Sequence, residues 1–307
     1  MRVLRDPQFT LPQDRGASVA IGNFDGVHLG HQHVLNLAKR PGAPLGVVTF
    51  EPHPREVFAP DAPPFRLMNA TARASRLDKL GVDLLAELPF EDRLSNLSAE
   101  AFVTDILVGG LGISHVVVGA DFCFGKGRAG NAVLLEKMGE VHGFDVTIVP
   151  LLERDNGAVS STAIRRALTD GRPRDAAQML GHWHRIEGPV LHGEKRGREL
   201  GYPTANMALD NLHVPKPGVY AVTVDIRDGA HAGSYGGVAN LGYRPMFELQ
   251  KPNLETHLFE FSGDLYGTDL SVGLVEYLRG EGKFDTLDAL ITQMDADSAA
   301  ARAALKS

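Results

Sequence analysis

The stretch ASVAIGNFDGVHLGHQHVLNLAK, residues 17–39, decides the fold class of the first half of the chain. It opens with an apolar run that predicts a buried strand over 17–22, passes through a glycine-containing loop, and ends in a helical pattern over 31–39. A strand, a loop and a helix in this order form the repeating unit of a parallel sheet with covering helices. The stretch therefore favours an α/β domain with a parallel sheet.

The same alternation continues to about residue 181. Apolar runs predict further strands over 45–50, 82–88, 115–119 and 144–149. Helical patterns lie over 71–80, 98–108, 131–138, 161–168 and 173–180. In open sheets of this kind ligands bind beyond the carboxyl ends of the strands, so residues that follow strands are the first candidates for a site.

Beyond residue 182 the pattern changes to short β runs interrupted by glycine and proline. These runs, spaced as in a small antiparallel β-barrel or sandwich, cover 185–191, 219–227, 234–240, 254–261 and 270–278. The segment SGDLYG, 262–267, predicts a hairpin turn, and apolar positions over 286–305 predict an amphipathic C-terminal helix. We therefore predict two domains, residues 1–182 and 183–307.

Composition narrows the class of protein. Of the 307 residues 43% are hydrophobic and 22% are charged, which indicates a folded, water-soluble chain. The net charge of −7 argues against a surface devoted to nucleic acid, because such binding depends on neutralising phosphates. The one cysteine, Cys123, allows no internal disulfide, and no apolar run is long enough to span a bilayer. We expect a cytoplasmic protein without nucleic-acid or membrane partners.

The loop GNFDGVHLGH, residues 22–31, is the first candidate site. His28 and His31 are three residues apart, so a helix starting near His28 places both imidazoles on one face at its N-terminus, where free N–H groups favour an anion. The pair can add positive charge near a polyphosphate; two incidental surface histidines are the alternative. The motif positions counted with this phosphate site are Gly22, Phe24, Asp25 and Gly30.

Other residues of the first half follow strands in the same way. Ser161, Thr162 and Arg165 open a helix after the last strand, and a plain helix cap accounts for only one hydroxyl there. Asp121, after the strand over 115–119, is a candidate for holding a hydroxyl or a base, and a loop cap is the alternative. His53 stands between two prolines, which fits a rigid turn slightly better than a functional site.

The segment GKGRAG, residues 125–130, matches the dinucleotide-binding spacing and has Asp145 twenty residues after its first glycine. The fingerprint, however, needs its first glycine at the end of a strand, and ADFCF intervenes here. A loop near a ligand is the preferred interpretation. A nicotinamide-dependent oxidoreductase built on this loop stays as an alternative.

The second half carries its own phosphate-handling pattern in HGEKRGRELGYPTANM, residues 192–207. Glycines allow backbone N–H groups to approach phosphates, and a hydroxyl and an amide oxygen from Thr204 and Asn206 suit a nucleotide-bound Mg²⁺. A solvated basic hairpin is the alternative. Glu255 lies in an otherwise apolar strand and is either a functional acid or base or a residue on the wet face. The loop residues counted with the nucleotide are Gly193, Lys195 and Gly197.

Over nearly its whole length the chain resembles the prokaryotic bifunctional riboflavin kinase/FAD synthetases. The matching pieces of the first half are GNFDGVHLGH, TFEPHP, LPFEDRLSNLSAEAFV, VVVGADFCFGKGRAGN and VSSTAIRRAL. Those of the second half are HGEKRGRELGYPTANM, PKPGVYAV, GGVANLGYRPMF, LETHLFEFSGDLYG and LRGEGKFDTLDALITQM. Their number and order together make the resemblance highly specific.

The resemblance implies two ATP-dependent reactions. An N-terminal Rossmann-like nucleotidyltransferase domain would join AMP from ATP to FMN and release pyrophosphate, with His28 and His31 at the triphosphate. Ser161, Thr162 and Arg165 would hold phosphates, and Asp121 would lie near the nucleotide. A C-terminal barrel would phosphorylate riboflavin with Mg²⁺ and ATP, using Thr204 and Asn206 at the nucleotide and metal and Glu255 as the base.

One departure from the family pattern concerns the kinase half. Met246 stands in RPMF where the family usually has threonine, so a hydroxyl near the kinase site is missing. A flavin-binding protein that has lost catalysis therefore stays as a second alternative.

Overall fold

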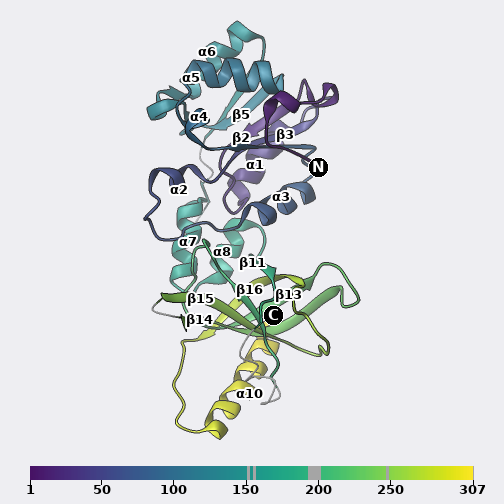
Figure 1. Ribbon diagram of the computed structural model, residues 1–307, viewed down its shortest axis with the longest axis vertical. Helices are drawn as coiled ribbons and strands as arrows, with labels where there is room; N and C mark the ends of the chain where they lie inside the picture. The colour runs from purple at the N-terminus through teal and green to yellow at the C-terminus, as the bar shows by residue number, and fades with distance from the viewer. Residues whose placement is uncertain (151–152, 155–156, 193–201, 247–248, 307) are drawn as a thin grey trace. The chain divides into compact units, whose positions relative to one another are not determined.

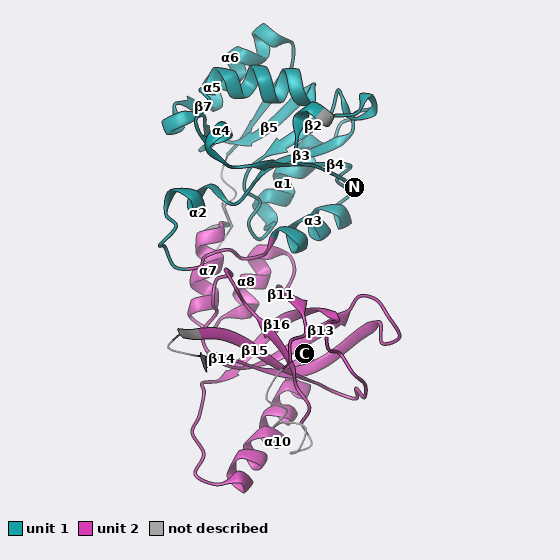
Figure 2. Ribbon diagram, viewed as in Figure 1, with its two compact units in different colours: residues 1–63, 70–159 teal, residues 64–69, 160–307 magenta. Residues whose placement is uncertain are grey.

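The computed structural model describes residues 1–150, 153–154, 157–192, 202–246 and 249–306. The chain forms two compact units, one of residues 1–63 and 70–159, the other of residues 64–69 and 160–307 (Figure 2). Among the described residues, no helix combines the length and the apolar character needed to cross a membrane.

The first unit is built on a six-stranded parallel sheet. Its strands, in spatial order, are β1 (Arg2–Leu4), β4 (Leu84–Pro89), β3 (Leu45–Glu51), β2 (Ser18–Ile21), β5 (His115–Gly119) and β8 (Asp145–Val149). The chain fills one side of β2 with β3 and β4 and then crosses to the other side with β5 and β8. The predicted α/β class is confirmed; the edge strand β1 is too short to give a periodic pattern and was missed.

Helices cover both faces of this sheet, with α1 and α3 on one side and α5 and α6 on the other (Figure 1). The helices are α1 (Leu29–Ala38), α2 (Pro54–Phe58), α3 (Ala70–Lys79), α4 (Asp92–Ser95), α5 (Ala99–Ala101) and α6 (Ala132–His142). The helix expected over 98–108 continues from α5 as a wider π-helical segment, Phe102–Leu111, and ends at Gly112 with a φ of 61°. Leu107, Val116 and Leu135 pack in the main core between helices and sheet.

Short elements complete the first unit. They are 3₁₀ turns at Pro7–Phe9, Pro12–Asp14 and Lys126–Arg128, and the strand pairs β6 (Cys123–Phe124) with β7 (Gly130–Asn131) and β9 (Glu153–Arg154) with β10 (Gly157–Ala158).

The second unit combines two helices with an antiparallel barrel. Its elements, with the strands in spatial order, are α7 (Ser161–Thr169), α8 (Pro173–Leu180), β11 (His184–Pro189), β16 (Asp269–Arg279), β13 (Gly218–Ile226), β14 (Gly233–Met246), β15 (Leu249–Leu258), β12 (Ala205–Ala208) and α10 (Leu287–Ala304). The two edge strands meet where the backbone N–H of Leu191 donates to the carbonyl of Asn206 at 2.8 Å. The expected small β-barrel with a C-terminal helix is therefore confirmed.

The alternation of buried and less buried side chains along β15 shows which residues face the barrel interior and which face outward. Leu254, Thr256 and Leu258 are buried, and Leu254 and Leu258 belong to the barrel core, so Glu255 and His257 face outward. The helix α10 covers part of the outer face, where Ala301 packs against Phe259.

Two expectations for the barrel were wrong. The segment 262–267 is no hairpin turn, because β15 and β16, which it helps to join, are not neighbours in the sheet. The strand β12 was missed, since its four residues follow the prolines and glycines of a motif that had been treated as a loop.

Candidate active sites

In the first unit, the strand order places the candidate ligand site at the carboxyl ends of β2 and β5. The connections from these two neighbouring strands depart on opposite sides of the sheet, which is the arrangement that opens a ligand crevice in α/β proteins. The loop of residues 22–28 follows β2, and Asp121 follows β5. Both sequence candidates therefore emerge at the same edge.

The loop between β2 and α1 is held in an uncommon backbone conformation. Phe24 and Val27, neither of them glycine, have φ values of 52° and 42°, and both side chains are buried. A left-handed conformation is costly for a β-branched residue and persists where the surroundings enforce it. The carbonyl of Asn23 accepts hydrogen bonds from Thr49 Oγ1 at 3.2 Å and from Arg73 Nη1 at 3.4 Å. These two donors fix the start of the loop.

His28 caps the helix that the loop enters. Its Nδ1 accepts the backbone N–H of His31 at 3.3 Å, so the neutral ring carries its proton on Nε2, which is then a donor. The two imidazoles are stacked, with centroids 3.7 Å apart and planes 16° apart. Nδ1 of His31 is buried and has no hydrogen-bond partner among the described residues. The spacing thus brings the two rings together as expected.

The surroundings of His31 favour the neutral form of its ring. Burial, and next the neighbouring His28, hold the pKa of His31 well below its ordinary value. Two stacked imidazolium rings would also repel each other. His31 is therefore neutral in the protein alone, and a bound anion would favour its protonation, as the predicted addition of positive charge near a polyphosphate requires.

The remaining candidates of the first unit have mainly structural contacts. His53 caps α2 in a capping box with Glu56, which supports the rigid-turn interpretation. A Cβ added at Gly119 would lie 2.9 Å from Oδ1 of Asp121, so this carboxylate folds back over the end of β5. The segment 125–130 closes the small hairpin of β6 and β7 instead of leading directly from a parallel strand into a helix. The dinucleotide-binding alternative therefore fails on geometry.

The residues that open α7 belong to the second compact unit. Ser160 is the cap, since its Oγ accepts the N–H of Ala163 at 3.2 Å, which leaves the hydroxyls of Ser161 and Thr162 outside the capping role. Nε of Arg165 donates to the carbonyl of Phe65 at 2.6 Å, and its guanidinium lies 5.3 Å from the Phe65 ring centroid. Arg165 thus helps to attach the segment 64–69 to α7.

In the second unit Glu255 and Asn206 lie side by side on adjacent strands. Asn206 on β12 is the register partner of Glu255 on β15, so both side chains leave the barrel on the same, outer face. Asn206 is buried, and Nδ2 of Asn253 donates both to its Oδ1 and to Oε1 of Glu255, each at 3.3 Å. Glu255 therefore lies on the outer face of the barrel, where it faces Asn206.

Tyr202 and His257 anchor the segment that carries Thr204. The Tyr202 hydroxyl donates to Asp295 on α10, and this hydrogen bond raises the pKa of Tyr202. The ring of His257 lies 5.0 Å from that of Tyr202, and its Nδ1 is 3.0 Å from the carbonyl of Pro203. These contacts set the position of the backbone just before β12.

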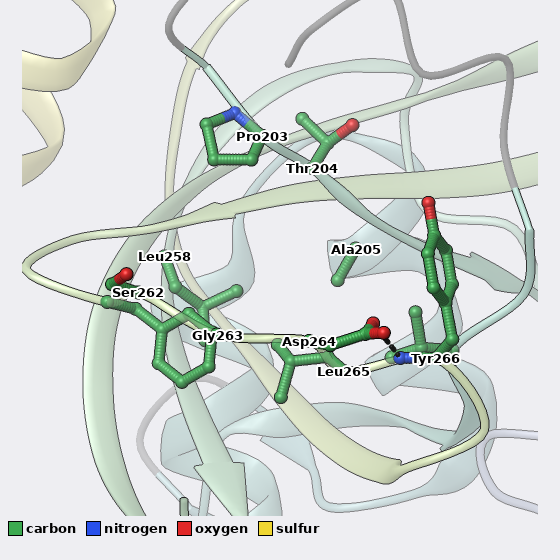
Figure 3. A pocket seen from close by; sticks show the side chains of 11 residues that line it. Pro203, Thr204, Ala205, Leu258, Ser262, Gly263, Asp264, Leu265 and Tyr266 are labelled. Carbon is green, nitrogen blue, oxygen red and sulfur yellow. Dashed lines mark hydrogen bonds between the residues drawn. The ribbon is translucent and has the colours of Figure 1, made fainter.

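A pocket of about 460 Å³ opens beside Thr204 (Figure 3). Pro203, Thr204 and Ala205 line one side, and Leu258 with the segment 261–266 lines the other. Oδ1 of Asp264 accepts the backbone N–H of Tyr266 at 3.1 Å, which shapes that segment. The lining combines apolar side chains with hydroxyls, as a site for a ring and a sugar requires.

Comparisons with known proteins assign both halves. A family model described as FAD synthetase matches residues 10–163, and one described as riboflavin kinase matches residues 180–305. The bifunctional riboflavin kinase/FMN adenylyltransferase of Pseudomonas fluorescens is 46% identical over 99% of this chain and 97% of its own, and that of Escherichia coli K12 is 40% identical over 95% and 93%. The chain belongs to this family.

A solved structure extends the comparison to the fold. A Streptococcus pneumoniae chain described as a macrolide-efflux protein superposes with a TM-score of 0.83 and 31% identity, covering 96% of each chain. The family predicted from the sequence motifs is confirmed, and with it an enzyme that has a riboflavin kinase part and an FAD synthetase part.

Some family positions lie outside the described residues, namely Gly193, Lys195 and Gly197. The side chain of Met246, at the end of β14, is likewise not described. The structure adds two residues that the sequence patterns did not single out, Asn253 beside Glu255 and Arg73 beneath the β2–α1 loop. Neither belongs to a motif; only the register of the strands and the packing of α3 bring them to the sites.

Proposed function

We propose that the second unit phosphorylates the ribityl 5′-hydroxyl of riboflavin with ATP and that the first unit transfers AMP from a second ATP to FMN, releasing pyrophosphate. The observation that carries this is the presence of two separate constellations, His28 with His31 and Asn206 with Glu255, each inside the span of its own family model. Neither transfer needs a protein nucleophile, because positioning and charge stabilisation supply most of the catalysis.

In adenylyl transfer, negative charge builds on the departing pyrophosphate. The Nε2–H of His28 and the free N–H groups at the start of the ten-residue helix α1 are donors for that charge. His31, stacked on His28, would take up a proton from solvent more easily once a bound triphosphate offsets its burial and its repulsion by His28. Asp121 is proposed as a further contact to this nucleotide, and Ser161, Thr162 and Arg165 are proposed to hold phosphates.

In riboflavin phosphorylation, Glu255 is the proposed general base, since its carboxylate can accept the proton of the attacking hydroxyl. The hydroxyl of Thr204 and the amide oxygen of Asn206 are hard oxygen donors, which fits Mg²⁺. Bound Mg²⁺ supplies charge neutralisation at the phosphates. Among the described residues no cluster of three His, Cys, Asp or Glu side chains forms a separate metal site, which suits an ion carried by the nucleotide.

The pocket beside Thr204 is the proposed site for the base and ribose of this ATP. Its lining combines apolar and polar side chains and includes Tyr266, whose ring lies 4.1 Å from that of His192 in a stacked arrangement. We further propose that the two catalytic parts divide near residue 182 and that the enzyme works in the cytoplasm on riboflavin, FMN and ATP.

Two full-length variants test the assignment of the reactions. Glu255→Gln should lower riboflavin-dependent ADP release by roughly 10²- to 10⁴-fold while FMN-dependent pyrophosphate release stays unchanged. His31→Ala should do the reverse. Glu260→Gln and His33→Ala, at exposed neighbouring positions, serve as matched controls. Loss of both activities in either variant would contradict the proposal.

A further inference from the structure

A chain of side-chain amides connects the nucleotide segment of the kinase site with Glu255. Nδ2 of Asn206 donates to the carbonyl of Thr204 at 3.4 Å. Oδ1 of Asn206 accepts from Nδ2 of Asn253 at 3.3 Å, and the same nitrogen donates to Oε1 of Glu255 at 3.3 Å. Asn253 is therefore the one link between the two groups in this chain of bonds.

The carboxylate of Glu255 determines the orientation of both side-chain amides in this series of hydrogen bonds. An ionised carboxylate only accepts hydrogen bonds, so Asn253 must present its NH₂ group to it. The second hydrogen of that NH₂ group then requires an acceptor at Asn206, which fixes Oδ1 of Asn206 toward Asn253 and its Nδ2 toward Thr204. Both hydrogens of Asn253 are thus used, one on each group.

Burial within the sheet restrains the side chain of Asn253. It is only 8% exposed, and its register partners are Ala208 on β12 and Gly242 on β14. Ala208 has a small side chain, and the carboxylate of Glu281 occupies the space over Gly242. A buried amide with both hydrogens engaged has little rotational freedom.

We propose that Asn253 is a positioning residue of the riboflavin kinase reaction. Its amide holds the Glu255 carboxylate and the Asn206 amide oxygen in one fixed relative orientation, so that the base meets the hydroxyl while Asn206 faces the phosphates. This role presupposes that Glu255 is the base, as proposed above. Loss of such alignment typically costs about tenfold to a hundredfold in rate.

The test compares three full-length variants of one residue by the kcat and KM of riboflavin phosphorylation. Asn253→Ala removes the amide, and Asn253→Asp keeps its shape but removes both donors and places a second carboxylate beside Glu255. Asn253→Gln keeps the NH₂ group. The proposal predicts that kcat falls about tenfold or more in the Ala and Asp variants, with little change in KM, and recovers in part in the Gln variant.

Controls separate positioning from folding and from simple charge. Asn211→Asp introduces the same charge at an exposed loop position and should leave the kinase rate unchanged. FMN adenylyl transfer, measured on the same samples, should not change in any variant. A purely structural role would make the shape-preserving Asp variant milder than Ala; that order, an effect on KM alone, or an unchanged kcat would overturn the proposal. If Glu255→Gln keeps full kinase activity, the proposed base itself is wrong, which is a different failure.

Discussion

A side chain at position 30 would disturb the histidine pair. A Cβ added at Gly30 would lie 3.1 Å from Cε1 and Nδ1 of His28 and 3.6 Å from the carbonyl oxygen of Val159. Gly30→Ala should therefore lower FMN adenylyl transfer about tenfold to a hundredfold by displacing the His28 ring. Its melting temperature should not fall, because alanine favours the helix by about 1 kcal/mol.

The kinase activity of the same Gly30→Ala protein is its internal control. Gly188→Ala is the matched variant, since a Cβ there meets nothing within 4 Å and its φ lies outside the left-handed region. An adenylyl transfer rate equal to that of the unmodified enzyme would show that the ring of His28 has no role.

His184 gives the second unit a dependence on pH. It is 2% exposed, and its Nε2 has no hydrogen-bond partner among the described residues. Burial, and next His213 and His182, lower its pKa from 6.5 to about 3. The unfolded chain therefore binds a proton that the folded chain refuses, so His184 lowers the free energy of unfolding by about 1.4 kcal/mol for each pH unit below its ordinary pKa.

The measurement is urea unfolding at pH 7 and pH 5, followed by the fluorescence of Trp183, the single tryptophan. In His184→Leu the loss of stability between the two pH values should be smaller by about 2 kcal/mol than in the unmodified protein. The exposed His142, changed to Leu, should have no such effect. An equal loss in the His184 variant would show that its folded pKa is not depressed.

For single residues, sequence reasoning succeeded where the spacing along a helix decides which side chains meet. The three-residue interval predicts that His28 and His31 meet, since one helical turn relates them. It could not predict the lowered pKa of His31, which comes from burial and next from the neighbouring His28. Nor could it find Asn253, because only the pairing of β15 with β12 places that amide between Asn206 and Glu255.

Between elements, Arg73 connects helix α3 with two strands and the β2–α1 loop. Its Nη2 contacts Glu51 at 2.9 Å and Glu87 at 3.0 Å, and Arg73 and Glu87 are 1% and 4% exposed. Arg73→Met leaves the Glu87 carboxylate buried without this partner, so the first unit should lose roughly 3–5 kcal/mol of stability.

Hydrogen exchange of the β4 amides, read by mass spectrometry, measures this loss as faster exchange. Adding Glu87→Leu to Arg73→Met should restore part of the protection, because the buried carboxylate that has lost Arg73 is then gone. Arg93→Met, at an exposed position on α4, is the control. Unchanged exchange in Arg73→Met would mean that the network contributes nothing to stability.

Element predictions held where a pattern was long and failed where it was short. Buried runs and helical periods placed the main strands and helices to within a few residues. The strand β12 has four residues and β1 has three, too few for a period to show. The hairpin expected at 262–267 was wrong because turn residues show where a chain bends, not which strands then pair.

In the whole molecule, the His28–His31 pair and the Asn206–Glu255 pair belong to separate compact units, each with its own core. The helices α7 and α8 pack within the second unit, although the sequence pattern had grouped them with the first domain. The change from helical patterns to short β runs near residue 182 marks where the β structure begins. The main segment of the second unit begins earlier, at residue 160. Helix–helix packing of this kind leaves no local signal in the sequence.

Mixing two variants, each of which lacks one of the two activities, tests the separation of the sites most directly. His31→Ala, supplied with riboflavin, Mg²⁺ and ATP, should stop at FMN, and Glu255→Gln should leave riboflavin unchanged. Combined in one vessel, they should convert riboflavin to FAD, because FMN released by the first is the substrate of the second; chromatography of the three flavins follows the reaction. A mixture that makes no FAD, although each variant keeps its own half-reaction, would contradict two independent sites.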